Sequence, residues 1–285
     1  MRLAVESIVT QDYPGDIEVI VVFDACPVEA PDVSLAENRT LRTTSNQRSR
    51  GLAGARNTGI VAASHDYVAF LDDDDHWLPG KLSAQMERFQ RSPHPILVGT
   101  AIVADDGVRQ HERLVPFEDV THAELLRDRM AGLHSSTFVF HTETLRSIGM
   151  VDEHLPGSYG EDYDLLLRTA KAGGIAVVNR PLVSCNWSGT SYFFGRWAAY
   201  ADGLTYLLEA HPQFADDRRA LGRIQSQIAF ARVAAKERAT GRRWALKALR
   251  NNPTQIKAWL ALAISLRLLS TGFVVRTVQR MGKGI

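Results

Sequence analysis

The sequence predicts an α/β protein with a mostly parallel central sheet flanked by helices, followed by a helical C-terminal extension. Two apolar runs of strand type, Ile17–Phe23 and Tyr67–Leu71, are each followed by acidic residues. Such runs are typical of buried parallel strands, and ligands bind at the carboxyl ends of such strands. Segments with helical spacing alternate with the strands, and from residue 191 onward the pattern is helical almost to the end.

The first half of the chain alternates between short helices and strands. Pro79 stands at the start of one predicted helix, a position where proline is favoured. The expected elements are a helix over 3–11, a strand over 17–23, a short strand over 39–43, a helix over 51–63, a strand over 67–71 and a helix over 81–90.

The second half continues the α/β pattern and then changes. Asp105-Asp106-Gly107 separates two apolar segments and predicts a hairpin. Further elements are a strand over 138–140, a helix over 161–172 that ends at Gly173 and Gly174, and a strand over 175–178. We therefore expect one α/β domain over residues 1–190 and a basic helical extension over residues 191–285.

Charge and cysteine content add two expectations. The two cysteines, Cys26 and Cys185, lie far apart, so no disulfide framework is indicated and a cytoplasmic location fits. The chain has a net charge of +1, yet residues 231–285 hold 12 Lys or Arg and one acid, Glu237. One hypothesis is that these helices contact an anionic membrane surface; the alternative is a helical cap packed on the catalytic domain.

Four consecutive carboxylates, Asp72 to Asp75, follow the second apolar run. Like charges repel at this density, and buried carboxylates are costly. A divalent cation would relieve both problems, and Mg²⁺ or Mn²⁺ prefers carboxylate oxygens and can also hold substrate phosphates. The alternative is an acidic turn exposed to solvent.

Two other acidic groups stand at comparable places. Asp24 follows the strand over 17–23, and Glu161, Asp162 and Asp164 open the helix over 161–172. One carboxylate at a helix start can simply complement the helix dipole. That explanation does not account for three acidic groups in one α/β order.

With these groups in place, the sequence resembles the family-two inverting glycosyltransferases, which have the GT-A fold. The resemblance covers roughly residues 1–190. Its motifs are Ser7-Ile-Val-Thr-Gln-Asp-Tyr-Pro14, Ile17-Glu-Val-Ile-Val-Val22 with Asp24, Gly54-Ala-Arg-Asn-Thr-Gly59, Phe70-Leu-Asp-Asp-Asp-Asp75 with Trp77, Pro79 and Leu82, Gly149 with Val151-Asp-Glu153, and Gly160-Glu-Asp-Tyr-Asp-Leu165 with Arg168.

The resemblance implies that a sugar moves from a nucleotide-diphosphate sugar to an acceptor hydroxyl with inversion, in cell-surface polysaccharide or glycolipid synthesis. A Mg²⁺ or Mn²⁺ ion would neutralise the leaving diphosphate, and a general base would activate the hydroxyl. The implied roles are donor binding by Asp24, Arg56, Asn57 and Asp72, metal binding by Asp74 with Asp72 and Asp75, and general base catalysis by Asp162 with Glu161 beside it.

The same resemblance implies the partners. They are a nucleotide-sugar donor and a glycan or lipid-linked acceptor, with peripheral contact on the inner face of the membrane as a hypothesis and with no nucleic acid. Two alternatives stay open. One is a catalytically silent sugar-nucleotide-binding or scaffold protein. The other is a nucleotidyltransferase, although no Gly-rich basic phosphate loop is visible.

Two departures from the family pattern carry expectations of their own. Family members open with an apolar strand, whereas here Met1 stands where the first helix begins. We therefore expect a central strand to be missing and the 285-residue chain to be poorly folded or inactive. Many members also carry a metal-binding histidine after the base helix, but the corresponding segment, residues 183–189, contains none.

Overall fold

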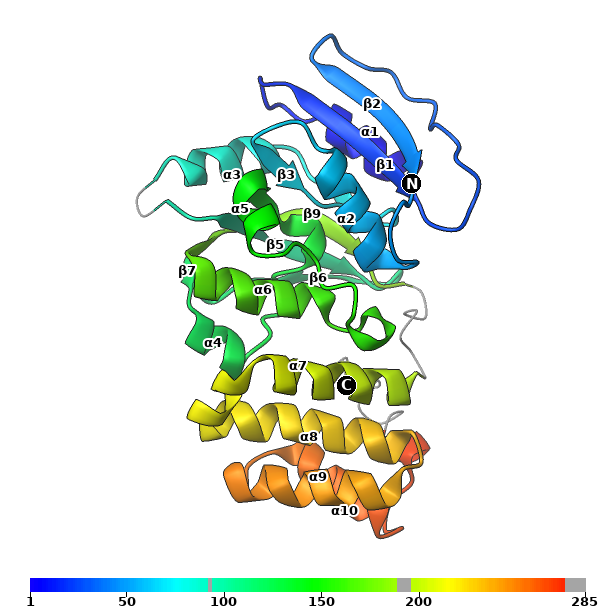
Figure 1. The fold of residues 1–285 in the computed structure, drawn as a ribbon, viewed down its shortest axis with the longest axis vertical. Helices are drawn as coiled ribbons and strands as arrows, with labels where there is room; N and C mark the ends of the chain where they lie inside the picture. Colours follow the sequence, from blue (N-terminus) through cyan, green and yellow to red (C-terminus); the bar gives the residue numbers. More distant parts are fainter. Residues whose placement is uncertain (92–93, 189–195, 275–285) are drawn as a thin grey trace. The chain divides into compact units, whose positions relative to one another are not determined.

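The computed structural model describes residues 1–91, 94–188 and 196–274, which fall into two compact units (Figure 1). Unit one contains Met1–Leu125, Arg129–Glu153 and Glu161–Thr190. Unit two contains Leu126–Asp128, His154–Gly160 and Ser191–Ile285. The main division lies between residues 190 and 191, and two short earlier segments group with the helical unit.

Helices and strands alternate up to residue 190, and the elements expected from the sequence are present. The helix over 161–172 and the strand over 17–23 have the predicted bounds. The elements are α1 (Arg2–Val9), β1 (Ile17–Phe23), β2 (Arg39–Ser45), α2 (Leu52–Ala62), β3 (Tyr67–Ala69), β4 (His76–Trp77), α3 (Lys81–Phe89), β5 (Leu97–Asp105), β6 (Gln110–Arg113), β7 (Asp119–Val120), α4 (His122–Arg127), η1 (Ser135–Thr137), β8 (Val139–His141), α5 (Thr142–Ser147), η2 (Pro156–Ser158), α6 (Glu161–Ala172) and β9 (Ile175–Asn186).

The strands of unit one form two sheets. β1 and β2 pair in parallel, and the other seven strands form a sheet with the order β3-β8-β5-β9-β4, in which β6 pairs with β5 and β7 with β9. Within the described residues of the larger sheet, β5 and β9 are the one parallel pair. The expected α/β fold with a central sheet flanked by helices is confirmed, but the larger sheet is mixed and not mostly parallel. Short strands such as β4, β6, β7 and β8 pair antiparallel with their neighbours, which requires no helical crossover.

Apolar packing explains why these elements hold together. α3 packs on β5 and β9, where Leu82 and Phe89 meet Val98, Ile102 and Val183 in one buried cluster. α1 and α2 both pack against β1. The predicted hairpin is present between β5 and β6, with Gly107 in the left-handed region at φ +82°. The prediction of a missing strand stays a prediction.

Beyond residue 196, unit two consists of helices. They are α7 (Trp197–Ala210), η3 (Pro212–Asp216), α8 (Arg218–Ala234), α9 (Arg238–Asn251) and α10 (Ile256–Ser265). Asp217 caps α8 by accepting hydrogen bonds from the backbone of Arg219 and Ala220. Small side chains on α9 and α10 pack with Phe230 and Val233 of α8. Among the described residues, no helix is long and apolar enough to cross a membrane. Arg276, Arg280 and Lys283 of the basic extension lie outside the described residues.

Candidate active site

Arg56 on α2 connects two of the three acidic groups singled out by the sequence. Its Nη2 lies 2.7 Å from Oδ1 of Asp72, and its Nη1 lies 3.1 Å from Oε1 of Glu161. Nη2 also donates to Oγ of Ser135 at 2.8 Å. Burial lowers the pKa of Arg56, but the charges of Asp72 and Glu161 outweigh burial, so the pKa is raised and the guanidinium stays charged. The end of β3, the start of α2 and the start of α6 therefore meet at one cation.

The turn that leads into α2 depends on Asp24 and Gly54. Asp24 accepts hydrogen bonds from Nδ2 of Asn46 at 2.9 Å and from the backbone of Gly51 at 2.8 Å. A Cβ at Gly54 would lie 1.9 Å from the carbonyl oxygen of Ser49, so only glycine fits there. Asp24 thus holds the loop that positions Arg56, and its expected contact with the nucleobase stays a prediction.

Asn57 points away from the group around Arg56. It is buried, and its amide exchanges two hydrogen bonds with the backbone of Val151, at 2.8 and 2.9 Å. Nδ2 also donates to Glu153 at 2.7 Å. Burial raises the pKa of Glu153, but hydrogen bonds from Asn57, Ser49 and Arg48 outweigh it and lower the pKa to about 2. Asn57 therefore fixes the loop over 151–153 against α2, and its donor contact stays a prediction.

The four aspartates after β3 occupy different environments. Burial raises the pKa of Asp72, but Arg56 and His134 outweigh burial and lower it. Asp74 is exposed, and partial burial together with the charges of Asp75, Asp72 and Asp73 raises its pKa. Asp75 is buried and accepts hydrogen bonds from Oγ of Ser136 at 2.6 Å and from the backbone of Asn186 at 2.9 Å. The segment is therefore more than a solvated acidic turn.

At the start of α6, the pKa values of two adjacent carboxyl groups are shifted from their ordinary values in opposite directions. Burial and the charge of Asp162 outweigh the attraction of Arg56 and raise the pKa of Glu161 to about 7. Burial also raises the pKa of Asp162, but Arg129, His134 and Arg56 outweigh burial and lower it. Near neutral pH, Asp162 is ionised while Glu161 is partly protonated. Such a separation is typical of carboxyl pairs with distinct acid–base roles.

Arg129 forms an ion pair with Asp162 that the sequence analysis missed. Its Nη1 donates to the carbonyl oxygens of Met130 and Leu133, so its own loop holds it in place. The sequence gives no signal for this contact, because an arginine beside Arg127 and Asp128 looks like part of a charged surface. Asp164, by contrast, is a structural residue, since it pairs with Arg168, which donates to the carbonyl oxygens of Ile148 and Met150.

The donor set around Asp74 fits a hard divalent cation. Asp74 is a carboxylate crowded by like charges, and no ion pair joins it to another described residue. Asp72 lies close enough to raise its pKa. Oxygen ligands of this kind suit Mg²⁺ or Mn²⁺.

Comparisons with known proteins find several glycosyltransferases similar to this chain. The pre-mycofactocin glycosyltransferase of Mycobacterium tuberculosis is 33% identical over 166 residues, covering 55% of this chain and 34% of the relative. The amylovoran biosynthesis glycosyltransferase AmsE of Erwinia amylovora is 28% identical over 178 residues, covering 61% of this chain and 65% of the relative. The chain thus spans between one third and two thirds of the length of these relatives.

Solved structures with the same fold include two nucleotide-sugar complexes. S. aureus TarS 1-349 in complex with UDP-GlcNAc superposes with a TM-score of 0.53 and 16% identity, covering 90% of this chain and 86% of TarS. The mannosyltransferase PcManGT from Pyrobaculum calidifontis in complex with GDP-Man and Mn²⁺ gives a TM-score of 0.53 and 17% identity, covering 97% and 79%. At this identity the likeness establishes the fold alone. The model of glycosyl transferase family 2 matches residues 1–149, just over half of the chain, and the chain therefore belongs to that family.

Proposed function

We propose that this chain transfers a sugar from a nucleotide-diphosphate sugar to a hydroxyl of a glycan or lipid-linked acceptor, with inversion at the anomeric carbon. The process would be cell-surface polysaccharide or glycolipid synthesis. The observation that carries this proposal is the pair of carboxyl groups at the start of α6. The pKa of Asp162 is lowered while that of Glu161 is raised to about 7, and Arg56 pairs with both Glu161 and Asp72.

The relatives support the proposed class of substrates. A relative from Escherichia coli, 27% identical over 139 residues, is named UDP-Glc:alpha-D-GlcNAc-diphosphoundecaprenol beta-1,3-glucosyltransferase WfgD. The structural neighbours bind UDP-GlcNAc in one case and GDP-Man with Mn²⁺ in the other. A nucleotide sugar is the feature that these names share.

Asp74, assisted by Asp72, would hold a Mg²⁺ or Mn²⁺ ion. When bound, such an ion neutralises the charge that accumulates on a leaving diphosphate. Arg56 keeps Asp72 ionised and in place for this role. Asp75 as a supporting ligand stays a prediction, because its carboxylate is held by Ser136 and Asn186.

Asp162 would remove the proton from the acceptor hydroxyl. Arg129 keeps this carboxylate ionised, so the group is a base across the neutral range. The side chain is partly exposed, and Arg129 contacts its Oδ2. Glu161 carries less negative charge because its pKa is raised, which reduces repulsion beside the base. A single displacement of this kind needs no covalent intermediate on the protein.

A donor screen followed by a turnover assay tests the proposal. UDP-, GDP-, dTDP- and CMP-sugars are added to the full chain with and without Mn²⁺, and a rise in the melting temperature reports binding. We expect one nucleotide class to bind in a metal-dependent way, with binding lost in Asp74→Ala. Product formation with a lipid-linked acceptor should fall by about 10²- to 10⁴-fold in Asp162→Asn. Binding without turnover in the wild type would favour a silent sugar-nucleotide-binding protein.

Peripheral membrane contact through unit two is a separate part of the proposal. α9 exposes Arg242, Arg243 and Lys247, and α10 exposes Ile256 and Trp259 with fractional exposures of 73% and 53%. Basic and large apolar side chains together suit an anionic lipid surface. We expect the full chain to sediment with anionic vesicles but not with neutral ones, and the double variant Arg242→Ser, Arg243→Ser to sediment less. Equal recovery of the wild type and the double variant with anionic vesicles would contradict this part of the proposal.

A further inference from the structure

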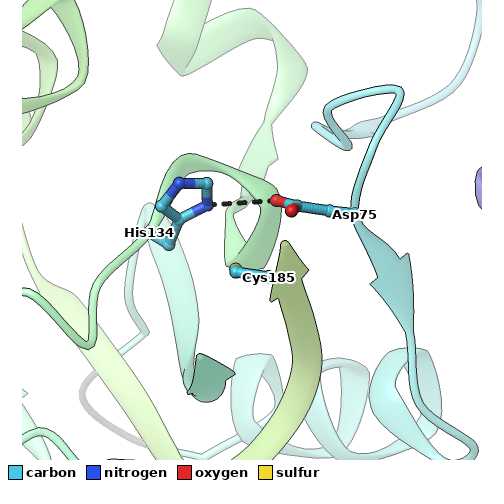
Figure 2. Close-up of side chains that lie close together, drawn as sticks. All are labelled: Asp75, His134 and Cys185. Atoms are coloured by element: carbon cyan, nitrogen blue, oxygen red, sulfur yellow. Dashed lines mark ion pairs between the residues drawn. The ribbon is translucent and has the colours of Figure 1, made fainter. Parts of the chain in front are cut away.

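Three side chains of different chemistry meet beside the acidic turn (Figure 2). Asp75 ends the turn, His134 precedes η1, and Cys185 lies near the end of β9. A carboxylate oxygen, an imidazole nitrogen and the sulfur lie within 4.8 Å of one another. Asp75 and Cys185 are buried, whereas the side chain of His134 is 25% exposed. The group is therefore closed on two sides and reachable past the imidazole.

His134 and Asp75 approach each other through Nδ1 and Oδ2. The backbone N–H of Ser136 donates to Nδ1 of His134 at 3.3 Å, so Nδ1 presents its lone pair. The same nitrogen lies 3.4 Å from Oδ2 of Asp75. The two atoms therefore lie close enough to bind one ion between them, with the imidazole giving up any proton on Nδ1. Imidazole nitrogen and carboxylate oxygen are both common ligands of divalent ions in proteins.

The surroundings hold the carboxylate in a fixed orientation. Oδ2 of Asp75 accepts from Oγ of Ser136 at 2.6 Å, and Oδ1 accepts from the backbone of Asn186 at 2.9 Å. Outer-shell hydrogen bonds of this kind are a usual feature of protein metal sites.

The ligand set distinguishes this group from the carboxylates at Asp74. Oxygen ligands select Mg²⁺ or Mn²⁺, whereas a set with nitrogen and sulfur selects a softer ion such as Zn²⁺. We propose that Asp75, His134 and Cys185 form a three-ligand site for a divalent ion of the zinc class, separate from the ion expected at Asp74. On binding, the S–H bond of Cys185 breaks, its proton leaves to solvent, and a metal–thiolate bond forms without any change in oxidation state.

This inference does not depend on the glycosyltransferase activity, because it concerns metal binding by the free protein. It assigns Asp75 to the zinc-class ion in place of the nucleotide-bound ion. A fourth coordination position would stay open, as in three-ligand zinc sites that also bind water.

Cobalt is the probe, because a Co²⁺–thiolate bond absorbs in the near ultraviolet and tetrahedral Co²⁺ absorbs in the visible. Titration of the full chain with CoCl₂ should saturate at one thiolate-bound ion per chain, and Zn²⁺ should displace it while Mg²⁺ should not. The two cysteines provide a matched control, since Cys26 is exposed and Cys185 is buried. We expect Cys185→Ser to abolish the thiolate band and Cys26→Ser to keep it.

Three further variants keep the test independent of folding defects at Cys185. His134→Ala removes a partly exposed ligand. It should therefore weaken Co²⁺ binding by at least about tenfold. Ser136→Ala keeps all three ligands and should weaken binding by roughly 10- to 100-fold. Asp74→Ala should leave the thiolate band unchanged.

Several outcomes would overturn the proposal. Absence of a thiolate band in the wild type would mean that His134 and Asp75 form a simple ion pair. A band lost in Cys26→Ser would assign the signal to the exposed thiol. A band lost in Asp74→Ala would merge this group with the nucleotide-metal site.

Discussion

The acidic groups at the start of α6 and after β3 neutralise their charge in different ways. Each carboxylate at the start of α6 pairs with an arginine: Arg56 with Glu161, Arg129 with Asp162 and Arg168 with Asp164. After β3, Arg56 pairs with Asp72, but no such ion pair joins Asp74 to another described residue. One region is balanced by the protein, and the other leaves negative charge for a ligand. The difference supports the proposal that Asp74 binds an external cation.

Loss of Arg56 should produce the largest effect, because this guanidinium serves both regions. Arg56→Met leaves Asp72 and Glu161 without their shared cation in a site where the side chain of Arg56 is 8% exposed. We expect the free energy of unfolding to fall by about 3–5 kcal/mol, the usual cost of removing one partner of a buried ion pair. Urea denaturation at pH 7 measures it.

Arg42→Met is the matched control. Arg42 pairs with Glu18 at 3.0 Å, but its side chain is 49% exposed. Exposed pairs contribute about 0–1 kcal/mol, so the control should stay within that range. If both variants lost the same amount, the central position assigned to Arg56 would be wrong.

Glu161 sharpens the comparison through pH. Its pKa is raised from 4.5 to about 7, so between these values the folded state binds more protons than the unfolded state. The contribution of Glu161 to stability is therefore full below pH 4.5 and is lost as the pH rises through 7. The difference corresponds to on the order of 3 kcal/mol. We expect Glu161→Gln to remove this fall in the free energy of unfolding with rising pH.

Urea denaturation between pH 4.5 and 8 would record the effect for Glu161→Gln against Glu143→Gln. Glu143 has a side chain that is 84% exposed, so its variant should keep the slope of the wild type. Parallel curves for all three proteins would mean that Glu161 has an ordinary pKa and that Arg56 fully balances its burial.

Lys81 extends the comparison to a cation without a partner. It is fully buried, its Nζ has no hydrogen-bond partner, and it lies 3.9 Å from the ring centroid of Trp77. Burial lowers its pKa well below 10.5. We expect Lys81→Met to raise stability at pH 7 by about 1–3 kcal/mol, since an unsatisfied buried polar group is removed.

The pH dependence checks the cause of that gain. Between the lowered pKa of Lys81 and 10.5 the unfolded state binds more protons, so wild-type stability should rise with pH in this window. Lys81→Met should lack the rise, whereas Lys171→Met, at an exposed position of α6, should keep it. A less stable Lys81→Met would show that the contact with Trp77 outweighs burial.

The sequence predicted the residues of this site better than their environments. Spacing and resemblance singled out Arg56, the aspartates after β3 and the start of α6, because local patterns carry those positions. Asp75 differs from Asp74 through Ser136 and Asn186, which lie 61 and 111 residues further along the chain. Contacts at such separations depend on strand pairing, so four consecutive aspartates looked equivalent.

The larger sheet shows the same limit of prediction from local sequence patterns. β9 was expected over 175–178 but extends over Ile175–Asn186, because β5, β4 and β7 all pair with it. Arg180 and Pro181 both lie within this strand. Local preference favours neither residue in a central strand. Long-range pairing outweighed local preference, and that extension carries Cys185 to the acidic turn.

The smallest expected effect concerns Arg129, and it separates electrostatics from packing. Burial raises the pKa of Asp162, but Arg129 together with His134 and Arg56 outweighs burial and lowers it. Arg129→Met should therefore move the acidic limb of kcat/KM to higher pH, with activity above that limb close to wild type. Arg129→Lys keeps the charge and should restore most of the limb. Arg127→Met changes a neighbour that pairs with Asp217 and should leave the limb in place. A uniform loss of activity at every pH in Arg129→Met would instead mean that the arginine only holds the loop, and that the ionisation of Asp162 is set by the remaining charges around it.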